Sequence, residues 1–218
     1  PEMLSFHNWQ EAWRIGKISI YAGNSLFVTS ISAVSVLLFS SMAAYAFSRI
    51  PFKGKNTMLS LLVFGLFIPV QSYFIAQNSI INFLDLGDSF FSLILPYIAM
   101  GLSLAIYILK EHFSAIPAEV EESAMIDGAS RYRIFFSIML PMVAPGIATA
   151  GVFTTLSAWN EFLLALLYIQ DPMMKTLTVG MYAFSGQHST DYAMLFSGLS
   201  IITIPMLIVY FLFNKVIV

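Results

Sequence analysis

The sequence contains no cysteine among its 218 residues. That absence excludes a disulfide framework, an iron–sulfur cluster and a zinc site held by thiolates. Only 10% of the residues are charged, whereas charged residues make up about a quarter of an average soluble domain. The formal net charge of −2 is too small to indicate nucleic-acid binding or strong electrostatic steering of an ionic partner.

Hydrophobic residues, in contrast, make up 58% of the chain, and the mean hydropathy is +0.81. A water-soluble fold cannot cover its surface with so few ionic groups, so this composition fits a lipid bilayer. The alternating polarity of a membrane β-barrel, which runs over strands of about ten residues, is missing. We therefore predict an all-α polytopic membrane helix bundle, with residues 1–218 as a single transmembrane domain.

Long charge-free runs predict five membrane-spanning helices in this sequence. A helix needs about 20 apolar residues to cross the hydrocarbon core, and each run reaches that length. The predicted spans cover residues 18–48, 57–80, 89–110, 141–165 and 192–214. Prolines interrupt the second, third and fifth runs at Pro69, Pro96 and Pro205. Each proline removes a backbone donor and favours a kink.

Lysine and arginine predict the orientation, because short cytoplasmic connections carry an excess of both. Seven of the ten lie after the first or third span or near the C-terminus: Arg49, Lys53, Lys55, Lys110, Arg131, Arg133 and Lys215. This side is therefore predicted to be cytoplasmic, with residue 1 outside and residue 218 inside. The sequence does not begin with methionine, and an additional span before residue 1 would bring both ends of the full chain inside.

A charged segment, residues 114–140, separates the third and fourth spans on the cytoplasmic side. Pro117 suits the first position of a helix, and the acidic residues after it lie where the helix dipole favours anions. Gly128 is placed to end this helix, because glycine adopts a left-handed cap without steric cost. A second short helix is predicted from Ser130 to Leu140. A simple connection needs only a handful of residues, so we expect this segment to contact a partner.

The same segment carries a spaced motif: Glu122-Ser123-Ala124, Gly128, Ile138 and Leu140-Pro141. Permeases of binding-protein-dependent ABC importers share Glu-Ala-Ala, three residues, Gly, nine residues, Ile, one residue and Leu-Pro. This sequence matches every spacing, with serine in place of the first alanine. The chain therefore resembles that family.

Three further stretches, residues 45–55, 124–130 and 159–162, resemble the carbohydrate-uptake, maltose-type branch. Over essentially its whole length the chain is similar to the second permease of a maltose-type pair. The family has one more span before this region, so six are expected in the full chain. The resemblance implies a permease that moves a sugar or oligosaccharide across the prokaryotic cytoplasmic (inner) membrane by alternating access.

The resemblance also implies the partners. They are a second homologous permease, two ATP-binding-cassette subunits and an extracellular solute-binding protein. The chain would also contact membrane lipid, and no nucleic-acid partner is expected. The chain itself is expected to be no enzyme and to bind no cofactor, since it lacks the Gly-x-x-x-x-Gly-Lys-Ser/Thr loop that holds ATP phosphates. ATP and Mg²⁺ would then belong to the ATPase subunits, on which the helix around Glu122 would dock as a coupling helix.

Three sets of site residues follow from this resemblance. The predicted ATPase-coupling residues are Glu121, Glu122, Ser123, Ala124, Asp127, Gly128, Leu140 and Pro141. A carboxylate suits docking because it pairs bidentately with arginine. Because aromatic faces and hydrogen-bonding side chains suit a sugar, the predicted substrate pathway contains Trp159, Asn160 and Glu161. The predicted binding-protein contacts are Gly186, Gln187 and His188, and no metal site is expected.

Other functions stay open at this point. Hydropathy alone permits a secondary transporter or channel, although the middles of the spans lack the ionisable residues that ion coupling uses. A membrane enzyme would need clustered His, Asp or Glu at a membrane face, and the acidic cluster at residues 119–127 has the importer spacing instead. Among ABC importers, a polyamine, a phosphate ester or a peptide is the alternative solute.

Overall fold

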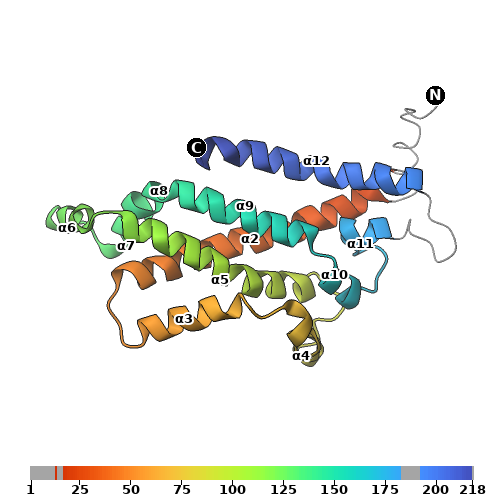
Figure 1. The fold of residues 1–218 in the computed structure, drawn as a ribbon, viewed down its shortest axis with the longest axis horizontal. Coiled ribbons are helices and arrows are strands. Elements are labelled where there is room, and N and C mark those ends of the chain that lie inside the picture. Colours follow the sequence, from red (N-terminus) through yellow and green to blue (C-terminus); the bar gives the residue numbers. More distant parts are fainter. Residues whose placement is uncertain (1–12, 14–16, 183–191, 218) are drawn as a thin grey trace. The chain divides into compact units, whose positions relative to one another are not determined.

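The structure is a computed structural model that describes residue 13, residues 17–182 and residues 192–217. Every regular element within these residues is a helix, and they contain no strand (Figure 1). The predicted all-α class is confirmed.

Within the described residues, two helices are long and apolar enough to cross a membrane without a break. Helix α2 covers Ile18–Arg49 and α5 covers Phe91–Ala115. At 1.5 Å per residue they are about 48 Å and about 37 Å long, more than the hydrocarbon core requires. Pro96 lies inside α5 without ending it. These helices overlap the stretches predicted as the first and third spans, and each continues past the predicted cytoplasmic end.

Two further candidate spans are broken pairs of helices. Helices α3 (Lys55–Gly65) and α4 (Val70–Phe83) are separated by a break that contains Pro69, as predicted. The segment Arg131–Met142 is followed by α9 (Ala144–Asn160) at a bend of 74°. The described residues therefore contain two candidate spans, or up to four if each broken pair is one span. Five spans remain a prediction.

Three helices follow α9. They are α10 (Leu163–Tyr168), α11 (Leu177–Tyr182) and α12 (Tyr192–Ile217). Helix α12 has 26 residues and contains Pro205, and it includes the whole of the predicted fifth span.

The chain divides into two compact units. Unit 1 comprises Pro1–Ser32, Tyr73–Tyr97 and Thr155–Phe211, and unit 2 comprises Ala33–Ser72, Ile98–Thr154 and Leu212–Val218. Five helices contribute residues to both units: α2, α4, α5, α9 and α12.

The core of unit 2 is built around the C-terminal half of α5. Leu109 and Phe113 are fully buried there, and the Tyr45 ring of α2 lies 5.7 Å from the Phe113 ring. Small residues allow the helices to approach closely. At Gly146 of α9, a Cβ atom would lie only 2.6 Å from the ring of His112, so glycine is required for this contact.

The core of unit 1 gathers side chains from α2, α9, α11 and α12. Its buried members are Ile18, Tyr21, Trp159, Leu177, Met181, Ile201, Ile202 and Met206. Gly180 of α11 allows the close contact with α2, because a Cβ there would lie 2.1 Å from the Tyr21 ring.

Candidate functional site

The segment between α5 and α9 forms the candidate site, and all of it lies in unit 2. Helix α6 (Ala118–Ile126) follows α5, and its N-cap is Pro117, with ψ of 142°. We predicted this proline at the first helical position, but the helix begins one residue later. Extended backbone satisfies the fixed φ of proline as well as a helix does. Glu119 and Glu121 lie in the first turn of α6, as the helix dipole favours.

Gly128 ends α6 as predicted. Its φ is +80°, a conformation that glycine adopts without steric cost. The N–H of Gly128 donates to Met125 O at 3.0 Å, and the N–H of Ala129 donates to Ala124 O at 3.0 Å. This pair of bonds is a Schellman motif, which satisfies carbonyls at the end of a helix. A Cβ atom at Gly128 would meet nothing within 4 Å, so backbone conformation alone requires glycine.

The predicted second helix begins where expected. The Ser130 hydroxyl accepts a hydrogen bond from Arg133 N at 3.3 Å and caps α7 (Arg131–Ile134). A π-helical turn, η1 (Phe135–Met139), and α8 (Leu140–Met142) continue the chain. Such π turns are rare and occur frequently at functional sites.

Helix α6 has an exposed face and a buried face. Glu122 is exposed, and Met125 and Ile126 are 49% and 87% exposed. Glu121 and Ala124 are buried on the opposite face. Among the other predicted coupling residues, Leu140 is half-buried. The remaining ones are exposed: Ser123, Asp127, Gly128 and Pro141. The exposed face therefore combines carboxylates with large apolar side chains.

Glu121 has a partner within its own chain. Its Oε1 atom lies 3.2 Å from Nε of Arg49, in the last turn of α2, and the two side chains are only 10% and 14% exposed. These two atoms face each other as an ion pair and are not aligned as a hydrogen bond. The Arg49 Nη2 atom donates to Phe113 O at 2.7 Å and to Ile116 O. Sequence reasoning missed this role for Arg49, although a stretch that resembles the family begins at Tyr45 and includes it.

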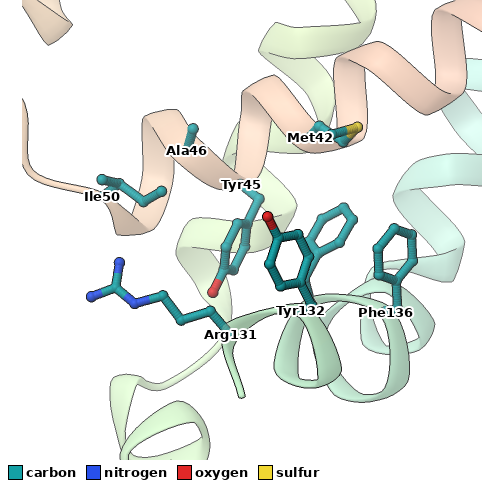
Figure 2. Close-up of a pocket in the computed structure, with 8 residues that line it drawn as sticks. Met42, Tyr45, Ala46, Ile50, Arg131, Tyr132 and Phe136 are labelled. Atoms are coloured by element: carbon teal, nitrogen blue, oxygen red, sulfur yellow. The ribbon is translucent and has the colours of Figure 1, made fainter.

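A cavity of about 300 Å³ lies beside this segment in unit 2 (Figure 2). Its lining residues are Met42, Tyr45, Ala46, Ile50, Arg131, Tyr132, Phe135 and Phe136. The lining is apolar apart from the Arg131 guanidinium and two tyrosine hydroxyls, and the Tyr45 hydroxyl points toward Arg131 (Figure 2). The cavity fits an apolar group better than a sugar.

The predicted pathway residues lie at the end of α9 in unit 1 and have different surroundings. The Trp159 side chain is buried, and its indole N–H donates to Ile202 O at 3.3 Å. Asn160 is exposed, and its amide donates to Leu156 O at 2.9 Å within the same helix. Of these two side chains, only that of Asn160 is exposed and accessible to a solute.

Glu161 occupies the break between α9 and α10. Its Oε1 atom accepts from Leu164 N at 2.8 Å, and its Oε2 atom accepts from Ala165 N at 3.1 Å. The Tyr97 hydroxyl donates to Oε2 at 2.7 Å, and the Thr178 hydroxyl donates to the Glu161 backbone carbonyl at 2.9 Å. The first N–H groups of a helix have no partner inside it, so this carboxylate caps α10.

The connection after α10 is held in unit 1 by side chains from other elements. Asp88 Oδ1 accepts from Gln170 N and Asp171 N, each at 2.9 Å. The Asn24 amide donates to Met173 O at 2.8 Å and to Lys175 O at 3.0 Å. The predicted binding-protein contacts, Gly186, Gln187 and His188, lie outside the described residues.

Tyr168 lies at the start of this connection and contacts α4. Its hydroxyl donates to Gln77 Oε1 at 3.2 Å. Burial raises the pKa of the Tyr168 phenol, and the nearby Glu161 carboxylate and Tyr73 add to the shift. The hydroxyl is therefore protonated at neutral pH and available as a donor.

A family model described as the binding-protein-dependent transport system inner membrane component matches residues 18–218. The chain belongs to this family. It is 38% identical to a putative ABC transporter permease protein, ORF2, of Caldicellulosiruptor sp., over 96% of this chain and 80% of that protein. The sequence-based assignment to ABC importer permeases is confirmed.

Two other relatives of this permease have more specific names. It is 36% identical to the trehalose/maltose transport system permease protein MalG of Thermococcus litoralis, over 91% of this chain and 72% of that protein. This permease is also 34% identical to the diacetylchitobiose uptake system permease protein NgcG of Streptomyces coelicolor, over 99% of this chain and 72% of that protein.

A solved structure shares the fold of this permease. It is a bacterial ABC transporter involved in the import of the acidic polysaccharide alginate. The TM-score is 0.82 at 21% identity, over 97% of this chain and 79% of that one. At this identity the likeness concerns the fold alone.

Proposed function

We propose that this permease imports a sugar or an oligosaccharide across the cytoplasmic membrane. An extracellular binding protein would deliver the solute, and the permease would pass it inward by alternating access. The names of relatives that transport trehalose, maltose or diacetylchitobiose support this solute class. The observation that carries the proposal is α6, a signature helix with an exposed acidic and apolar face between α5 and α9.

Helix α6 would be the coupling helix that docks on an ATPase subunit. Its exposed carboxylate, Glu122, can form a bidentate pair with an arginine of that subunit. Met125 and Ile126 present apolar area that a docking cleft would bury. Asp127 and Gly128 would hold the end of the docked helix. ATP and Mg²⁺ would bind to two such subunits and not to this chain, and a second homologous permease would complete the pathway.

The membrane topology belongs to the same proposal. The candidate spans, together with α12, would give five helices across the bilayer in these residues, and a preceding helix would give six. Residues 114–140 would then lie on the cytoplasmic side, where lysine and arginine are concentrated.

The substrate pathway would include Asn160, whose amide is exposed at the end of α9. Trp159 and Glu161 would support the pathway without contacting the solute, because their polar atoms already have partners in this chain. The segment at residues 186–188 would contact the binding protein.

Uptake by reconstituted transporters tests the proposal. The permease would be assembled with its partner permease, ATPase subunits and binding protein in liposomes that contain ATP. Radiolabelled maltose, trehalose, diacetylchitobiose, a polyamine, a sugar phosphate and a dipeptide would be offered separately. We expect ATP-dependent uptake of at least one neutral sugar and no uptake of the last three. Uptake of a polyamine, phosphate ester or peptide alone would reassign the solute, and uptake without ATP would favour a secondary transporter.

A further inference from the structure

One guanidinium group in unit 2, that of Arg49, connects the ends of α2 and α5 with α6. Arg49 belongs to the last turn of α2, and it donates to the carbonyls of Phe113 in the last turn of α5 and of Ile116 just after it. The same side chain forms the ion pair with Glu121 of α6 at 3.2 Å. Helices α2 and α5 are the two described helices that are both long and apolar enough to cross a membrane without a break. Arg49 lies in the last turn of α2 and contacts the last turn of α5, so the ends of both helices meet at the residue that holds α6.

The chemistry of arginine suits this position. The last carbonyls of a helix have no intrahelical partner and carry the negative end of the helix dipole. A guanidinium presents five N–H donors in a rigid planar fork, so it can reach two carbonyls and a carboxylate from one place. A lysine carries all its donors on one atom and cannot reproduce this arrangement.

Arg49 forms an ion pair with Glu121. The Glu121 side chain is 10% exposed, and Oε1 accepts no hydrogen bond from the described residues. Buried ion pairs contribute little net stability compared with apolar side chains, and their best-attested use is to fix one arrangement of the elements that carry them. The Arg49–Glu121 pair is therefore better suited to position α6 than to stabilise unit 2.

We propose that Arg49 and Glu121 form a clasp that makes α6 move together with the adjoining ends of α2 and α5. The clasp rests on the proposed function, in which an ATPase subunit displaces α6. Adjacent carboxylates then have separate tasks: Glu122 faces outward to the ATPase, and Glu121 faces inward to Arg49. Both members of the clasp are positioning residues, since neither would touch the solute or ATP.

A distance measurement tests the clasp without any solute. The chain has no cysteine, so spin labels at Met42→Cys in α2 and Ala118→Cys in α6 would be the only labels on this subunit. Both positions are exposed and lie in unit 2, and Ala118 is not part of the proposed docking surface. In the assembled transporter we expect one narrow distance distribution. Arg49→Lys should broaden it, because the ammonium cannot hold both α5 and Glu121. The exposed Arg133→Lys is the matched control and should leave it narrow.

Coupling is the second readout. In liposomes, the number of solute molecules imported per ATP would be measured with the sugar that gives uptake. We expect Arg49→Lys and Glu121→Gln each to lower this ratio roughly fivefold while the ATPase rate stays within about twofold. The double variant should be no worse than either single one, because both changes break the same contact.

These outcomes separate the clasp from the proposed function. Unchanged distances and an unchanged ratio in Arg49→Lys would overturn the clasp. Arg49→Lys keeps a positive charge beside Glu121, so we expect normal assembly, and failed assembly would instead assign the pair to stability and overturn the proposal. If the wild-type transporter imported no sugar, the proposed solute would be wrong, while the distance distributions would still report on the clasp.

Discussion

The carboxylate of Glu161 has partners for both oxygens at the break between α9 and α10. Glu161→Ala would leave Leu164 N, Ala165 N and the Tyr97 hydroxyl without their acceptor. Loss of hydrogen bonds to a charged group of this kind costs about 1–3 kcal/mol. We expect the purified transporter to unfold at a lower temperature, with a smaller shift for Glu161→Gln, as measured by thermal denaturation.

Glu111→Ala is the matched control for this prediction, because Glu111 is exposed and contacts only the neighbouring Lys110 among the described residues. An unchanged melting temperature together with a lost sugar affinity would show that Glu161 contacts the solute directly and does not mainly cap α10.

Gly128 is required for its backbone conformation and not for lack of space. Gly128→Ala places a non-glycine residue at φ +80°, which costs about 1–2 kcal/mol. Gly128→Asn should cost less, since asparagine tolerates the left-handed region. We expect the ATPase subunits to bind wild type most tightly, Gly128→Asn less tightly and Gly128→Ala least, as measured by co-purification. Equal binding by Gly128→Ala and wild type would contradict a role for the Schellman motif in α6.

The connection after α10 depends on Asp88, which lies between α4 and α5. Asp88→Ala would remove the acceptor of Gln170 N and Asp171 N. We expect hydrogen exchange at these two amides to become about five- to tenfold faster, since a lost hydrogen bond contributes roughly 1–1.5 kcal/mol. Mass spectrometry of peptides that cover residues 169–175 would measure the change.

Asp85→Ala controls for backbone strain in that experiment. Asp85 has φ of 53° and Asp88 has φ of 54°, so the two substitutions impose the same conformational cost. Asp85 does not share the two bonds that Asp88 makes to the connection after α10. Equal acceleration in both variants would attribute the effect to strain and not to the hydrogen bonds of Asp88.

The two ends of α6 were predictable from the residues at each end, whereas the contacts of α6 with other helices were not predictable. The requirements of proline, glycine and serine act over a few residues, so the sequence placed Pro117, Gly128 and Ser130 correctly to within one position. The Arg49–Glu121 pair joins residues that are far apart in the chain, and no local pattern reveals which of two adjacent glutamates faces inward. Glu161 is similar, because its capping role depends on Tyr97 and on a helix break without proline or glycine.

At the scale of the whole molecule, composition and a five-position signature were sufficient for the class and the family. Low charge and long apolar runs predicted membrane helices, and the family model over residues 18–218 confirms the assignment. The breaks in the two broken pairs of helices lie at prolines, as the sequence predicts. Pro69 lies in the break between α3 and α4, and Pro141 and Pro145 flank the bend of 74° between Arg131–Met142 and α9.

The central functional claim is that ATP hydrolysis in partner subunits is coupled to this permease through Glu122 on α6. The most direct test is the ATPase rate of the reconstituted transporter with binding protein, with and without its sugar, for wild type, Glu122→Gln and Glu111→Gln. We predict that sugar stimulates wild type and Glu111→Gln equally, and that Glu122→Gln loses the stimulation by roughly tenfold, as expected for a charged pair in an interface. Full stimulation of Glu122→Gln would show that α6 does not couple through this carboxylate.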